Sequence, residues 1–218
     1  MPLLTDPAAI AGLVTREVRT GTRDGAPTRI AVARRSYPTD RADLWDAVTN
    51  IERIPRWFLP ISGELRVGGR YRLEGNAHGV VEQCDAPERF AVTWEMDNRV
   101  SWLTLELTAT ADGTQLELAH EAPADPEFWT QYGPGAVGVG WDLALMGLGL
   151  HLASGAPVDQ AEAMRFPATP EGATFIRTAA LEWADAATDD GDDPNAAQAA
   201  AARTIDAYTA VPEDGSDS

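Results

Sequence analysis

The sequence contains no lysine and only one cysteine, Cys84. Without a lysine amine, Schiff-base mechanisms are excluded. A single thiol cannot form an intramolecular disulfide, and such sparing use of cysteine is typical of a reducing cytosol. The three histidines (His78, His120 and His151) form no pair at metal-ligand spacing. We therefore expect neither a structural zinc site nor any other metal.

Positive charge is also scarce, since 17 arginines stand against 34 acidic residues and the net charge is −17. A chain this acidic repels phosphate backbones and anionic membrane surfaces, so nucleic acid and membranes are not expected partners. The longest apolar run, Val139 to Ala153, is interrupted by Asp142 and His151 and is predicted to be too short to span a bilayer. Residues 1–13 lack the features of a signal peptide. These observations predict a cytoplasmic protein.

Common catalytic patterns are missing from the chain. We find no G-x-S-x-G elbow, no H-E-x-x-H and no P-loop. Residues 133–138 match G-x-G-x-x-G, but a dinucleotide site requires a preceding strand and a βαβ unit, and neither is predicted there. The segment is expected to be a loop leading into a helix. No cofactor and no catalytic residue is predicted.

The patterns that are present indicate an α+β fold. Strand-like alternation covers 14–20 and 29–37, and Asp24-Gly25 between them predicts a turn. Two short helices follow, the first over 41–49. Alternation then returns in four runs between residues 78 and 120, where Asp112-Gly113 is a strong hairpin signal. Short turns require an antiparallel meander. After Pro126, apolar residues recur at helical spacing from Val139 to Leu150, which predicts a long buried helix.

The remaining residues predict an acidic helical tail. Thr169-Pro170-Glu171 and Asp193-Pro194 are helix starts, and Phe175, Ala179 and Trp183 form an apolar stripe expected to pack on the long helix or the outer sheet face. The expected organisation is an N-terminal arm with an extra strand, a central domain, an acidic helical extension and a disordered end. Their ranges are 1–28, 29–153, 154–211 and 212–218.

The order of elements and several local sequences resemble the START-like (SRPBCC) superfamily, in the branch named for the activator of Hsp90 ATPase. The resemblance covers roughly Ile30 to Leu152. It is carried by Leu44-Trp45-Asp46-Ala47-Val48-Thr49, Pro55-Arg56-Trp57-Phe58, Val67-Gly68-Gly69-Arg70-Tyr71, Val92-Thr93-Trp94-Glu95, the Asp112-Gly113-Thr114 hairpin and Gly138-Val139-Gly140-Trp141-Asp142. It implies a helix-grip (START/Bet v1-like) fold, in which a curved antiparallel sheet wraps around a long C-terminal helix and encloses a cavity.

The resemblance also indicates which residues would line that cavity. The candidate ligand-binding residues are Trp57, Phe58, Tyr71, Trp94, Trp102, His120, Trp141, Leu145 and Leu148. Aromatic side chains at these positions are equally consistent with plain core packing, since each can bury a large area. Trp102 and Glu106 are predicted to share one face of a strand, so one of the two lies in an unexpected environment.

Three functions remain open from the sequence. The first is a module that binds a small apolar or aromatic molecule in the cavity. The second is a cyclase- or aromatase-like enzyme, which needs at least two convergent polar groups beside the cavity. The third is a chaperone-associated interaction protein, which needs an exposed apolar patch. The sequence does not predict the oligomeric state.

Overall fold

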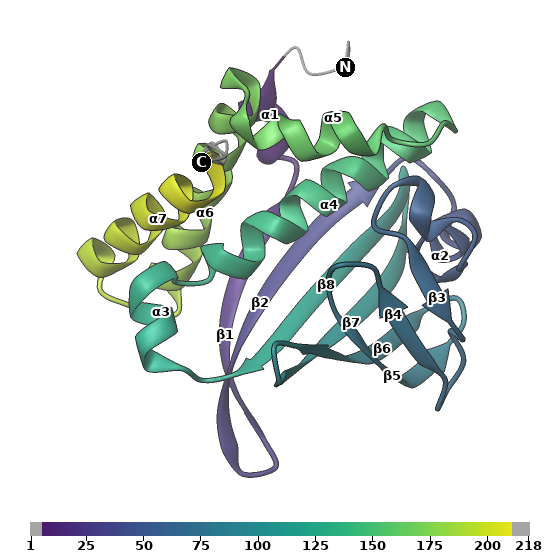
Figure 1. Ribbon diagram of the computed structural model, residues 1–218, viewed down its shortest axis with the longest axis horizontal. Helices are drawn as coiled ribbons and strands as arrows, with labels where there is room; N and C mark the ends of the chain where they lie inside the picture. The colour runs from purple at the N-terminus through teal and green to yellow at the C-terminus, as the bar shows by residue number, and fades with distance from the viewer. Residues whose placement is uncertain (1–5, 211–218) are drawn as a thin grey trace, which may run out of the picture.

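The computed structural model describes residues 6–210, which contain one sheet of eight strands in the order β1-β2-β8-β7-β6-β5-β4-β3 (Figure 1). Every neighbouring pair is antiparallel. The strands are β1 (Thr15–Arg23), β2 (Ala26–Tyr37), β3 (Ile61–Gly63), β4 (Arg70–Leu73), β5 (His78–Asp85), β6 (Arg89–Met96), β7 (Arg99–Thr110) and β8 (Gly113–Pro123).

The helices lie mainly on one side of this sheet. The long helix α4 crosses the sheet diagonally (Figure 1). They are α1 (Pro7–Ala11), α2 (Arg41–Thr49), η1 (Ile54–Arg56), α3 (Pro126–Tyr132), α4 (Gly135–Ser154), α5 (Gln160–Arg165), η2 (Phe166–Ala168), α6 (Pro170–Asp189) and α7 (Pro194–Thr209). The sheet wrapped around α4 confirms the predicted α+β helix-grip fold.

The hairpin signals in the sequence have clear physical causes. Asp24 and Gly25 both have positive φ, as do Asp97 and Asn98 between β6 and β7. Consecutive residues of this kind form turns whose twist matches that of the flanking strands. Gly113 begins β8 at φ 145°, and a Cβ there would lie 2.1 Å from the Tyr37 carbonyl oxygen. Glycine is therefore required at this position both by conformation and by space.

The helix α4 is held to β2 by polar contacts as well as by its apolar surface. Arg35 Nη1 and the Tyr37 hydroxyl both donate to the Leu145 carbonyl, at 3.1 and 2.9 Å. By length and composition α4 could cross a membrane, because the helix has 20 residues and begins before the shorter apolar run from Val139 to Ala153. In the structure, however, 56% of its most apolar window is buried within the fold.

The tail continues the helical layer rather than forming a separate unit. The helix α6 packs on α1, β1, α4 and α7. Its stripe residues Phe175, Ala179 and Trp183 are almost completely buried. The stripe was predicted to pack on the long helix or on the outer sheet face. In the structure α6 packs on the long helix α4 and also on the edge strand β1.

The predicted domain limits differ from the structure at the N-terminus. β2 begins at Ala26, so the expected boundary at residues 28/29 falls within a strand. The extra strand of the arm is β1, which is part of the main sheet because it pairs with β2 along its whole length. The end that was expected to be disordered, 212–218, lies outside the described residues.

Candidate functional site

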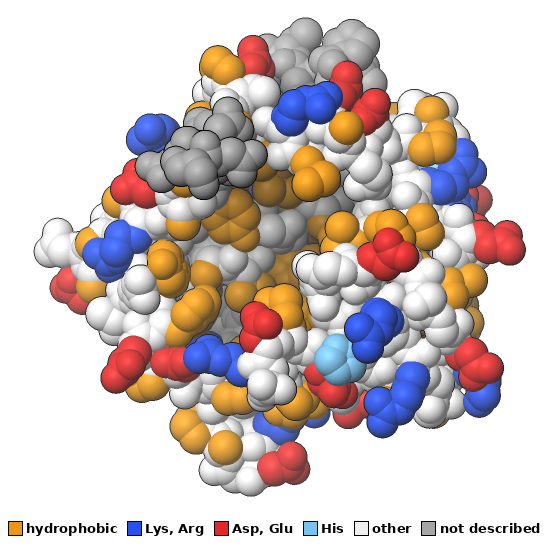
Figure 2. All heavy atoms as spheres, viewed as in Figure 1, with side chains coloured by type: hydrophobic (Ala, Val, Ile, Leu, Met, Phe, Trp, Pro, Cys, Tyr) orange, Lys and Arg blue, Asp and Glu red, His pale blue; other side chains and the backbone are white. Residues whose placement is uncertain are grey.

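A cavity of about 80 Å³ lies between the inner face of the sheet and α4. Its wall combines α2, η1 and the segment after it, five strands (β3, β4, β6, β7 and β8) and α4, and it is almost wholly apolar. The lining residues are Val48, Ile54, Trp57, Phe58, Ile61, Leu65, Tyr71, Leu73, Phe90, Val92, Trp94, Leu103, Leu105, Leu116, Leu118, Trp141, Ala144 and Leu145. In the space-filling view this side of the molecule is hollowed near its centre, with apolar side chains around the hollow (Figure 2).

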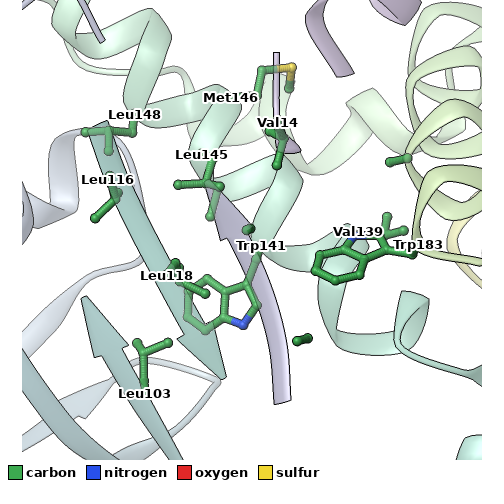
Figure 3. Close-up of a cluster of buried hydrophobic side chains, with 14 of the residues drawn as sticks. Val14, Leu103, Leu116, Leu118, Val139, Trp141, Leu145, Met146, Leu148 and Trp183 are labelled. Carbon is green, nitrogen blue, oxygen red and sulfur yellow. The ribbon is translucent and has the colours of Figure 1, made fainter. Parts of the chain in front are cut away.

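Six of the nine candidate residues line this cavity, namely Trp57, Phe58, Tyr71, Trp94, Trp141 and Leu145. Trp141 and Leu145 extend from α4 toward leucines of the facing strands, including Leu103 and Leu118 (Figure 3). Trp141 is packed between other rings, with centroids 5.0 Å from Trp94 and 6.1 Å from Phe58. The elbow after η1 thus meets α4 through stacked aromatic side chains.

Trp102 does not line the cavity, because strand alternation points it to the other face of β7 from Leu103 and Leu105. There the Arg23 guanidinium carbon lies 4.2 Å from its ring centroid. On the same outer face, Glu106 pairs with Arg89. The residue with the unexpected environment was therefore Trp102, whose exposed face is covered by a cation.

Leu148 is fully buried but is also absent from the wall. It lies three residues beyond Leu145, or about 4.5 Å further along the helix axis. Leu148 packs in the same hydrophobic cluster as Leu116, beyond the end of the cavity. Its role in the structure is core packing.

His120 lies behind the wall rather than in it. Its Nδ1 accepts a hydrogen bond from Trp141 Nε1 at 2.9 Å, and its Nε2 lies 2.8 Å from Ser101 Oγ. Since Ser101 Oγ donates to the Trp94 carbonyl, its lone pair accepts the His120 Nε2 proton. His120 is thus neutral, and burial lowers its pKa to about 4.

The polar atoms of the wall that form hydrogen bonds do so within the protein. Trp57 Nε1 donates to the Ala47 carbonyl at 2.8 Å, and the Tyr71 hydroxyl donates to the Thr93 carbonyl at 2.8 Å. Burial raises the pKa of Tyr71 well above its ordinary value. With Trp141 bound to His120, these groups fix the shape of the wall and do not converge on a point inside it.

Sequence reasoning missed the aliphatic residues that the sheet contributes to the wall, including Val92, Leu105 and Leu116. These residues occupy alternate positions on β6, β7 and β8, so their side chains point to the same face of the sheet. That alternation was the signal that could have identified them. Nothing in the sequence distinguished them from other inward-facing residues. Among residues 6–210 no group of three metal-ligating side chains is found.

Comparison with known proteins identifies relatives of this fold. The solution structure of CalU16 from Micromonospora echinospora is 29% identical, with 82% of this chain and 97% of that chain covered and a TM-score of 0.68. The crystal structure of CalU16 is 28% identical, with 80% of this chain and 98% of that chain covered and a TM-score of 0.65. Protein MLL2253 from Mesorhizobium loti is 21% identical over 57% of this chain and 97% of its own, with a TM-score of 0.52, and shares the fold.

No curated protein sequence matches significantly. The sequence model of one family, described as activator of Hsp90 ATPase homolog 1-like protein, matches residues 38–153, which is more than half of the chain. That segment runs from the end of β2 through α4 and contains every residue of the cavity wall. The chain therefore belongs to the activator of Hsp90 ATPase homolog 1-like family, within the START-like (SRPBCC) superfamily.

Proposed function

We propose that this protein binds a small apolar or aromatic molecule in the cavity between the sheet and α4. The observation that carries the proposal is the composition of the wall, in which 18 residues from distant parts of the chain present apolar atoms to one space. Ligand pockets are typically of this kind, with few polar groups. Apolar surface facing such a space favours an apolar occupant over water.

The volume limits the size of the ligand. A protein cavity of about 150 Å³ lined by apolar side chains can bind benzene. The present cavity is about half that size, so an aromatic ring would require part of the wall to move outward. Phe58 follows η1 rather than lying in the sheet, so its ring can move without breaking the strand ladder.

The wall supports binding more than catalysis. None of the 18 lining residues is acidic, basic or histidine. A cyclase-like reaction would need groups that move protons at the substrate, and His120 is shielded from the cavity by Trp141. The expectations of contact with a chaperone and of a cytoplasmic location stay predictions.

The first test is native mass spectrometry of the full chain purified from its own host, followed by organic extraction. A stoichiometric apolar small molecule is the expected result. In parallel, the protein is titrated with benzene, toluene and indole, followed by thermal shift and by chemical shifts of the indole N–H groups. A bare polypeptide that responds to none of the three probes would refute the proposal.

A matched pair of variants locates the binding. Ala144 lines the cavity, whereas Ala153 lies exposed on the same helix. Ala144→Leu fills part of the space and should weaken binding of the best probe at least tenfold. Ala153→Leu should leave binding unchanged. Equal loss in both variants would place the binding elsewhere.

A further inference from the structure

A second, smaller cavity of about 60 Å³ has in its wall His120, which is hydrogen-bonded to Trp141. It is bounded by β2, β8, α3 and the first turn of α4. Unlike the first cavity, it has charged residues in its wall, Arg29 and Asp125, together with His120 and Trp129. The two cavities share no lining residue.

The two spaces approach each other at His120, whose ring contacts both Trp141 and Trp94 of the first cavity wall. Trp141 belongs to the wall of the first cavity and His120 to the wall of the second. Their rings are 5.8 Å apart between centroids and are joined by the hydrogen bond from Trp141 Nε1 to His120 Nδ1. Without the Trp141 indole, the first cavity would therefore extend to His120, which is a wall residue of the second.

The position of the Trp141 indole is fixed from both sides. On the cavity side, Phe58 stacks on Trp141 with an interplanar angle of 28°, and Trp94 packs against it edge to face. On the other side, His120 is held by Ser101, which is itself bonded to the Trp94 backbone. Trp141 is consequently held in one orientation by Phe58, which follows η1, by Trp94 of β6 and by His120 of β8, which is itself hydrogen-bonded to Ser101 of β7.

We infer that Trp141 is the residue that determines ligand length, because its indole closes the apolar cavity before the charged second cavity is reached. The inference rests on the proposed function. It restricts the ligand of the native protein to compact, wholly apolar molecules. Beyond the Trp141 indole, Arg29 is already paired with Asp190 and Asp192, so the second cavity suits an uncharged polar end group such as a hydroxyl.

The inference is tested with a series of straight-chain alcohols from butanol to decanol on the native protein, Trp141→Ala and Trp141→Leu. Each added methylene should tighten binding by about fourfold until the cavity is full. We expect the gain to stop at a short chain in the native protein and to continue for several more carbons in both variants. Trp102→Phe, on the outer sheet face, serves as the control and should keep the native limit. Circular dichroism verifies that each variant is folded, and the leucine variant keeps apolar bulk if the alanine variant unfolds.

A second measurement does not depend on any organic ligand. Crystals of the native protein and of the Trp141 variants are pressurised with xenon, which occupies apolar cavities. Native crystals should show xenon only in the first cavity or at two separate positions, and the variants should show continuous occupancy between them. If native protein binds neither an alcohol nor benzene, toluene or indole, the proposed function fails while the xenon result still decides whether Trp141 separates the two cavities. An unchanged length limit in a protein that does bind alcohols, or xenon sites unaltered by the substitutions, would overturn the role of Trp141.

Discussion

At the scale of single residues, the polar groups that matter are buried and paired inside the fold. His120 links α4 to β7 through Trp141 and Ser101, and it does so in the neutral form. Its pKa falls from 6.5 to about 4 because burial disfavours the imidazolium. Since the unfolded chain binds this proton more tightly, His120 contributes stability above about pH 6.5 that is lost as pH falls toward 4.

We expect this residue to lower the free energy of unfolding by about 3 kcal/mol between pH 7 and pH 4. Asp142 acts in the opposite direction, because burial raises its pKa to about 6 and its proton is then bound more tightly in the folded state. The contribution of His120 is therefore taken as the difference between native protein and His120→Gln, measured by urea unfolding across this range. Parallel pH profiles of the two proteins would contradict the prediction.

A second buried group is the ion pair between Arg16 and Asp142. Arg16 Nε donates to Asp142 Oδ2 at 3.1 Å, and Trp183 Nε1 donates to the same oxygen at 2.8 Å. Both side chains of the pair are at most 1% exposed. Asp142 Oδ1 has no hydrogen-bond partner within residues 6–210. This carboxylate therefore depends on Arg16 for charge compensation.

Arg16→Met should cost about 3–5 kcal/mol of unfolding free energy at pH 7, because it leaves a buried carboxylate without its cation. The loss should shrink at pH 5, where Asp142 takes up a proton. Combining it with Asp142→Leu should recover most of the stability. Arg34→Met, whose partners Glu17 and Glu117 lie on the outer sheet face, is the control and should cost about 1 kcal/mol or less. A double variant as unstable as Arg16→Met alone would argue against this account.

At the scale of elements, glycines in α4 determine how closely its neighbours approach. A Cβ at Gly138 would lie 2.2 Å from the Trp183 ring of α6, and one at Gly147 would lie 2.8 Å from the Trp57 carbonyl oxygen. At Gly149 the nearest atom is instead Arg35 Nη2, the end of a flexible side chain. A side chain is therefore excluded by close neighbours at Gly138 and Gly147, whereas at Gly149 the neighbouring arginine can move.

Gly138→Ala should destabilise the protein by about 1–3 kcal/mol. The cost of the steric clash with the Trp183 ring is expected to exceed the stability gained from the higher helix propensity of alanine. Gly149→Ala should change stability by less than about 1 kcal/mol, since the arginine can move aside. Denaturant unfolding of both variants, with Trp183 fluorescence as a local reporter, checks the contrast. Equal effects of the two substitutions would show that packing against α6 is not the cause.

At the scale of the whole molecule, the family segment and the acidic tail form one core. The buried cluster contains residues of β1, α4 and α6 together, such as Val18, Val139 and Trp183. The tail also forms charged contacts with the sheet, where Arg29 of β2 pairs with Asp190 and Asp192. A fragment limited to residues 38–153 would therefore expose apolar surface that is buried in the full chain.

Truncation after Gly155 removes α5, α6 and α7 and should abolish cooperative thermal unfolding. The expected product is a chain that binds a dye specific for exposed apolar surface and has weak near-ultraviolet circular dichroism. A comparison with the full chain under the same conditions provides the control. A truncated protein that unfolds cooperatively near the native melting temperature would show that the tail is dispensable.

The order and type of the elements could be predicted from local patterns in the sequence. Alternation, the Asp24-Gly25 and Asp112-Gly113 turns and the apolar run from Val139 to Leu150 predicted an antiparallel sheet with a buried helix, because these signals are local. The resemblance to a known family added the cavity. From it, two thirds of the candidate residues could be placed in the wall, and the aromatic ones on α4 and the elbow were the most accurately placed.

The face of the sheet and the depth at which each side chain lies depend on how distant segments pack together. Trp102 was misplaced because an aromatic residue favours burial on average, whereas Arg23, on a strand distant in sequence, covers it outside the sheet. His120 lies behind the wall because Trp141 stands between it and the cavity. The Arg16–Asp142 pair joins residues 126 positions apart, and no local pattern encodes such a contact. These features depend on long-range packing, which fixes side-chain partners that spacing along the chain leaves undetermined.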